Sequence, residues 1–194
     1  ELLKSDNEDL VLSTLEYLLL HESKDSSLVY NQYLNHTNLK IANAALLCLA
    51  REAKDNQTLK LSYQLEERIS NKIDYVKNKP DDISTIKFLL RTIGNANFIK
   101  YHSFIQFYLD HKNQDIVTSA IYAAGLTMHT QFISPLLSFL PNKIYRESAK
   151  EALLNYGVQI LPILSNSIKE RSEPIVICRC IPMVFEVFNS QESI

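Results

Sequence analysis

The sequence predicts an all-α fold, an α-α superhelix (solenoid) of about six stacked helix pairs. Small residues recur at a constant interval, because Ala120, Ala149 and Cys178 each lie 29 positions after the one before. Further along the same units, FISPLL (132–137) is matched by QILPIL (159–164). A repeat of this length with helical periodicity is typical of stacked helix pairs. The composition, with three Gly and six Pro, also favours helix.

The first third of the chain follows the same pattern of paired helices. Residues 9–20 are apolar at helical spacing, and a second helix is expected over residues 28–34, with Ser26 or Ser27 as its N-cap. A third helix is expected over residues 39–52. Shifted by 76 residues, the segment 38–49 lies over 114–125, with Ala44 on Ala120. These segments are therefore predicted to be copies of one unit.

The middle of the chain is predicted to hold two longer helices and a return helix. A single helix is expected over residues 57–78, followed by 83–93, a turn at Gly94-Asn95, and a return helix over 98–109. The buried face of the first of these is predicted to carry Leu61, Leu65, Ile69, Ile73 and Val76. Its other face carries Glu66, Glu67, Arg68, Lys72 and Asp74, which we interpret as a solvated face.

The last units contain Gly and Pro residues at positions typical of the ends and first turns of paired helices. Gly125 and Gly157 are each predicted to end a helix, and Pro135 and Pro162 to lie in the first turn of a second helix, where a missing N–H has little cost. An Ala at one point of each unit allows neighbouring helices to pack closely. No segment has the composition of a linker, so residues 1–194 are predicted to form one elongated domain.

The composition excludes several classes of protein. A net charge of −2 is evidence against a nucleic-acid binder, which carries a strong excess of Lys and Arg. Three Cys cannot form a disulfide framework, which favours a reducing compartment. The most apolar window, Ile41–Ala50, is too short to span a bilayer. Because the chain begins at Glu1 without Met or a leader, we expect a fragment of a longer chain.

No residue pattern predicts catalysis, a cofactor or a metal site. Cys178 and Cys180 are two apart, so on a helix they do not face each other, and no second Cys or His pair completes a zinc site. The five His are scattered, and no glycine-rich phosphate loop is present. Lys143, Arg146 and Lys150 alternate with glutamates, which indicates a solvated face more than an anion site.

The second helices of a solenoid usually line its concave surface, where extended binding faces form. The candidate binding residues are therefore the polar positions of those predicted helices. They are Asn31, His102, Gln106, Ser138, Asn166 and Lys169.

The small-residue columns, the turn after Ala-Ala-Gly (123–125) and the FISPLL and ILPIL helices resemble HEAT repeats of the short bacterial type, related to phycobilisome-lyase HEAT-like repeats. More narrowly, ALLNYG (152–157) and RCIP (179–182) resemble the HEAT segment fused to bacterial membrane proteins of the ATP/ADP-translocase or major-facilitator type. Cys180 departs from that pattern, where a second Arg is common. The resemblance implies a scaffold for protein interactions, in the cytoplasm and attached to the inner membrane through the parent chain.

The leading hypothesis is thus a non-catalytic helical scaffold that binds a protein partner or a neighbouring domain of its own chain. Two alternatives are a HEAT-like alkylpurine DNA glycosylase and a bilin lyase subunit. The absence of Trp and the net charge of −2 are evidence against the glycosylase, whose resemblance implies a basic, aromatic-lined groove. The bilin lyase alternative is supported only by the type of repeat.

Overall fold

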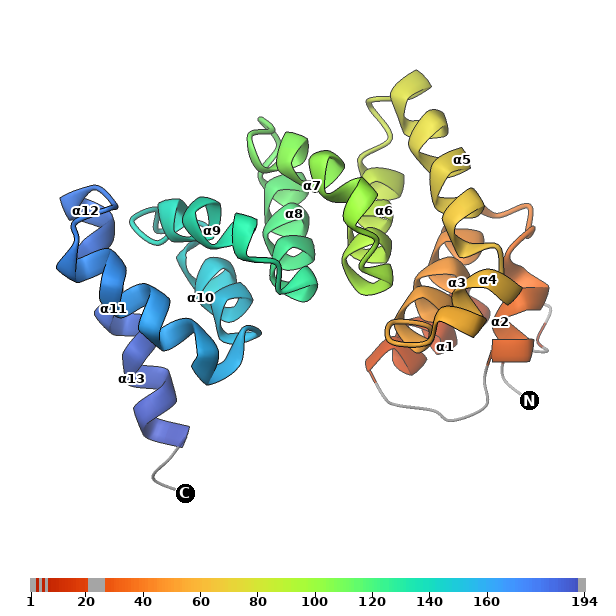
Figure 1. The fold of residues 1–194 in the computed structure, drawn as a ribbon. Helices are drawn as coiled ribbons and strands as arrows, with labels where there is room; N and C mark the ends of the chain where they lie inside the picture. The colour runs from red at the N-terminus through yellow and green to blue at the C-terminus, as the bar shows by residue number, and fades with distance from the viewer. Residues whose placement is uncertain (1–2, 4, 6, 21–26, 192–194) are drawn as a thin grey trace. The chain divides into compact units, whose positions relative to one another are not determined.

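The computed structural model describes residues 3, 5, 7–20 and 27–191. Every regular element in these residues is an α-helix or a short 3₁₀-helix, so the predicted all-α class is confirmed for them (Figure 1). The contacts divide the chain into two compact units, Glu1–Ser103 and Phe104–Ile194, which we describe separately. The single domain over residues 1–194 stays a prediction.

The first unit is built around helix α3 (Leu39–Glu52), which packs against α1, α2 and α6. The other helices of the unit are α1 (Glu8–Leu20), α2 (Ser27–Tyr33), α4 (Gln57–Ser62), α5 (Leu65–Asn78) and α6 (Ile83–Ala96). All ten residues from Ile41 to Ala50 are buried, because neighbours cover every side of this helix. The window that the sequence marks as its most apolar is therefore the centre of the first unit.

Residues 57–78 form two helices, so the prediction of one long helix is wrong. Gln64 adopts the left-handed conformation (φ 49°) and separates α4 from α5. Of the predicted buried face, Leu65, Ile69, Ile73 and Val76 are buried on α5. Leu61 lies beyond the break and is 68% exposed. Helical spacing continues across Gln64 in the sequence, and this continuity hides the change of direction.

Two glycines that were predicted to end helices lie inside them. Helix α6 continues through Gly94 to Ala96 and ends at Asn97, which is left-handed (φ 51°). Helix α8 (Gln114–Thr127) continues through Gly125 and ends at Met128 (φ 50°). Left-handed residues still end both helices, as sequence rules expect. These residues are Asn97 and Met128, not the two glycines.

Gly125 allows two helices of the second unit to meet. The remaining helices of the unit are α7 (His102–Leu109, which the unit boundary crosses), α9 (Ile133–Phe139), α10 (Arg146–Leu154), α11 (Leu161–Lys169), α12 (Ile175–Cys178) and α13 (Pro182–Gln191). A Cβ at Gly125 would lie 2.6 Å from both Cα and Cβ of Ala152 on α10. No real Cβ tolerates that distance, so the contact between α8 and α10 requires glycine.

One further turn prediction is wrong, and two are confirmed. Gly157 does not end a helix: α10 ends at Leu154, and Gly157 (φ 65°) is the first residue of the 3₁₀-helix Gly157–Ile160. Pro135 and Pro162 lie in the first turns of α9 and α11. Of the two predicted N-caps, Ser26 lies outside the described residues, and Ser27 is the first residue of α2. Residues 98–109 form a 3₁₀ turn at Ile99–Tyr101 followed by α7.

The turn before α3 has the same hydrogen bonds as the turn before α8. The backbone N–H of Asn38 donates to Nδ1 of His36 (3.0 Å), and that of Asn113 donates to Nδ1 of His111 (3.1 Å). Asn38 and Asn113 then cap helices of 14 residues each. The equivalent positions are therefore 75 apart, and the predicted alignment of Ala44 with Ala120 is one residue out of register. Runs of small residues make such a slip invisible in sequence.

We expect Gly125→Ala to destabilise the second unit by about 1–3 kcal/mol, because the added methyl group overpacks the α8–α10 contact. The direction of the change in stability tests the close contact, since Gly→Ala inside a helix ordinarily stabilises a protein by about 0.8–1.0 kcal/mol. Chemical denaturation followed by circular dichroism measures the change. Glu151→Ala, at an exposed position of α10, is the control and should change stability little. A stabilised Gly125→Ala variant would contradict the close approach.

Candidate functional site

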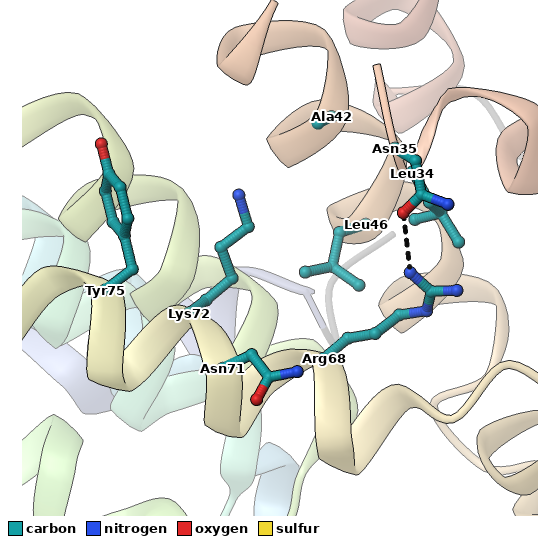
Figure 2. Close-up of a pocket in the computed structure, with 8 residues that line it drawn as sticks. All are labelled: Leu34, Asn35, Ala42, Leu46, Arg68, Asn71, Lys72 and Tyr75. Carbon is teal, nitrogen blue, oxygen red and sulfur yellow. Dashed lines mark hydrogen bonds between the residues drawn. The ribbon is translucent and has the colours of Figure 1, made fainter. Parts of the chain in front are cut away.

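A pocket of about 270 Å³ lies in the first unit between the C-terminal end of α2 and helices α3 and α5 (Figure 2). Its wall from α5 carries four residues, of which Asn71 and Lys72 each lie three or four positions from both Arg68 and Tyr75, so the four belong to one side of the helix. The opposite wall is formed by two residues that follow α2 and by two residues of α3. The lining residues are Leu34, Asn35, Ala42, Leu46, Arg68, Asn71, Lys72 and Tyr75.

The lining combines an apolar floor with a polar rim. Leu34, Ala42 and Leu46 are buried, at 8%, 4% and 4% exposed. Asn35 and Asn71 are exposed at the rim. Apolar walls with a few directed polar groups are typical of ligand sites in proteins.

Arg68 is held in a fixed direction by the break between α4 and α5. Its Nε donates to the carbonyl oxygen of Tyr63 (3.0 Å), which the helix break leaves available. One Nη1 hydrogen donates to Oδ1 of Asn35 across the pocket mouth (3.5 Å), as Figure 2 shows. The interruption of the helix at Gln64 therefore also positions the guanidinium at the pocket.

Lys72 brings a second cation to the same wall. Its Nζ lies 5.9 Å from the centre of the Tyr75 ring. Burial lowers the pKa of Lys72, and the negative charge of Asp82 opposes this effect in part. Within the described part of the chain, no carboxylate lies within 4.0 Å of this ammonium group. The partly buried charge therefore lacks a close counterion.

A series of hydrogen bonds connects Tyr75 on α5 to α6 and α3. Its hydroxyl donates to Oδ2 of Asp82 (3.3 Å), whose Oδ1 accepts from the backbone N–H of Thr85 (3.0 Å). Nδ2 of Asn43, buried on α3, donates to Oγ1 of Thr85 (3.2 Å). Burial acts to raise the pKa of Asp82, but hydrogen bonds from Thr85 and Tyr75 and the charge of Lys79 hold it below its ordinary value. Helices α3, α5 and α6 are thus tied together beside the pocket.

None of the binding residues predicted from the sequence lines this pocket. Five of the six are exposed: Asn31 on α2, Gln106 on α7, Ser138 on α9, and Asn166 and Lys169 on α11. His102 is buried at 4% exposed. Their assignment to one concave binding face stays a prediction.

Sequence reasoning missed the pocket because it assigned Arg68 and Lys72 to a solvated face. Both are only partly exposed. A signal was present in the sequence, since Arg68, Asn71, Lys72 and Tyr75 follow helical spacing and two of them are cations. Sequence spacing does not show which residues lie opposite this face of α5, because Asn35 and Leu46 reach the pocket only through the packing of α2 and α3.

The other candidate chemical groups are held in structural contacts. In the described residues, no three His, Cys, Asp or Glu side chains are grouped to hold a metal ion. Burial raises the pKa of Cys48 to about 12, and its Sγ contacts the carbonyl oxygen of Leu15 (3.6 Å). Cys178 Sγ donates to the carbonyl oxygen of Glu173 (3.3 Å). Lys150 pairs with Glu147 (2.5 Å), and Arg146 Nε donates to the carbonyl oxygen of Leu140 (2.8 Å).

Comparison with known proteins gave no relative: no protein-family model matches the chain, and no curated protein matches it. The search for membrane spans was also negative, since the described residues contain no helix with the length and apolarity to cross a bilayer.

We expect Lys72→Met to raise the thermal unfolding midpoint. The variant keeps the aliphatic stem and removes a partly buried charge whose desolvation lowers the pKa of Lys72 and costs stability in the folded state. Lys77→Met is the matched control on the same helix, because Lys77 is exposed and pairs with Asp74 (3.1 Å). An unchanged or lower midpoint for Lys72→Met, relative to Lys77→Met, would contradict the desolvation argument.

We expect the stability contributed by Asp82 to be lost at acidic pH. Because its folded-state pKa is depressed, the contribution is present above the unfolded-state pKa of about 3.9 and disappears as the pH falls through the folded-state pKa. Asp82→Asn removes this pH-dependent stabilisation. The unfolding free energy of the variant should therefore fall less between pH 7 and pH 3 than that of the unchanged protein. Urea titrations at several pH values measure both slopes. Equal slopes would show that the carboxylate contributes nothing.

Proposed function

We propose that the protein is a non-catalytic helical-repeat scaffold of the HEAT-like type, and that its first unit binds a segment of a protein partner or of a neighbouring domain. The observation that carries this proposal is the pocket between α2, α3 and α5. Its functional groups are a guanidinium, an ammonium, two carboxamides and a phenol over an apolar floor. These groups recognise and orient a ligand through hydrogen bonds, charge and apolar contact.

The size of the pocket favours part of a polymer over a free cofactor. Sites for drug-sized ligands are about 300–1,000 Å³, and this pocket is about 270 Å³. A cavity of that size takes one or two amino-acid side chains.

The packing within each unit supports the repeat architecture in this proposal. Helix α3 lies against both α1 and α6, and α10 lies against α8. These are the helices that the sequence repeat assigns as the first members of successive pairs. The recurring His-x-Asn turns before α3 and α8 support the same assignment. A solenoid of such pairs presents extended surfaces for binding proteins.

Selection of a random peptide library displayed on phage tests the function. We expect enriched peptides to bind the protein in isothermal titration calorimetry. Asn71→Trp, which places a bulky ring at the exposed rim of the pocket, should weaken their binding at least about tenfold, a loss of about 1.4 kcal/mol.

Ser70→Trp adds the same ring at the neighbouring exposed position of α5, which does not line the pocket, and should leave binding unchanged. Failure to enrich any binding peptide, or equal effects of the two tryptophans, would overturn the proposed function.

A further inference from the structure

We propose that the pocket between α2, α3 and α5 recognises a carboxylate side chain, Glu or Asp, of the bound segment, with the carboxylate between Arg68 and Lys72 and an adjacent apolar side chain on Leu34, Ala42 and Leu46. This inference rests on the proposed function, since it names the group that the same pocket binds. Four features of the structure support it.

The first feature is the direction of Arg68. A guanidinium carries five N–H groups, and the protein uses one at Nε and one at Nη1. The remaining N–H groups of Arg68 donate to no protein atom within the described residues. Because the contacts to Tyr63 and Asn35 fix the plane of the group, these donors are held ready for a bidentate acceptor. Carboxylates fit that geometry.

The second feature is that Lys72 joins Arg68 without a counterion of its own. The two side chains lie one turn apart and extend from the same face of α5 (Figure 2). Two like charges at this spacing are unfavourable when the pocket is empty. An anion between them removes that repulsion and supplies the counterion that the ammonium of Lys72 lacks.

The third feature is the sign of the charge at this place. The lining contains two cations and no Asp or Glu, although the whole chain has a net charge of −2. The acid whose charge acts on Lys72 is Asp82, and its carboxylate is engaged by the Thr85 N–H and the Tyr75 hydroxyl. The pocket is therefore a local cationic site on an acidic protein.

The fourth feature distinguishes a carboxylate from a phosphate. Phosphate sites commonly use free backbone N–H groups at a helix N-terminus. The lining residue in the first turn of α3, Ala42, already donates its N–H to the carbonyl oxygen of Asn38 (3.1 Å). The floor is apolar, which suits the methylene groups of Glu and a neighbouring aliphatic side chain.

The test uses N-acetyl-leucyl-glutamyl amide as the probe, N-acetyl-leucyl-glutaminyl amide as its neutral isostere, and inorganic phosphate. Titrations are followed by ¹⁵N NMR of the arginine Nε–H resonances. We expect the glutamyl probe to shift the Arg68 resonance and to bind at least about tenfold more tightly than the glutaminyl probe, because hydrogen bonds to charged groups are the stronger ones. Binding should weaken as salt is added.

Lys72→Met should weaken glutamyl binding about tenfold, while Lys77→Met, the exposed control on α5, should leave it unchanged. Arg68→Gln should abolish binding of the glutamyl probe. If the Arg68→Gln variant unfolds because it loses the hydrogen bond to Tyr63, Lys72→Met still tests the proposal. Equal binding of the two dipeptide amides would overturn the carboxylate assignment. So would phosphate saturating the Arg68 resonance at a lower concentration than the glutamyl probe.

The two proposals fail in different ways. If selected peptides bind at the pocket but the glutamyl probe does not, the carboxylate assignment is wrong and the scaffold function stands. If neither the selected peptides nor the glutamyl probe binds, both proposals are wrong.

Discussion

The first unit depends on the burial of one helix on all its sides. Helix α3 contacts α1, α2 and α6, and every residue from Ile41 to Ala50 is buried. Neighbours can surround a helix in this way only where small side chains alternate with larger ones, as in the AALLCLA run (44–50). In the second unit, the contact of Gly125 with Ala152 applies the same constraint more severely, because no side chain at all fits.

The pocket follows from that packing. Helix α5 does not close completely on α2 and α3, and Arg68 and Lys72 line the space that is left between them. A core built only for stability would place an apolar residue at Lys72, since a partly desolvated ammonium without a close counterion is unfavourable. Residues that reduce stability at a concave site are characteristic of binding sites. This physical cost supports the proposal that the pocket binds a ligand.

The sequence predicted the helices well where local signals determine them. The positions of helix α3 and of Pro135 and Pro162 follow from periodicity and the first-turn rule. The break at Gln64 was missed because a left-handed Gln leaves no compositional mark. The pocket was missed for a related reason: its walls come from segments more than twenty residues apart, and only one of them shows helical spacing of cations.

By itself the sequence determined the all-α class, the approximate positions of the helices and the recurrence of small residues. Those features depend on side-chain periodicity, which any window of the chain displays. Tertiary structure decided what Gly125 does, how far the repeat is shifted, and which polar residues meet. A glycine inside a helix and a glycine at its end look alike in sequence, whereas the approach of Ala152 to Gly125 exists only after α8 and α10 have packed. Arg68 and Lys72 likewise line a pocket only because α2 and α3 lie opposite.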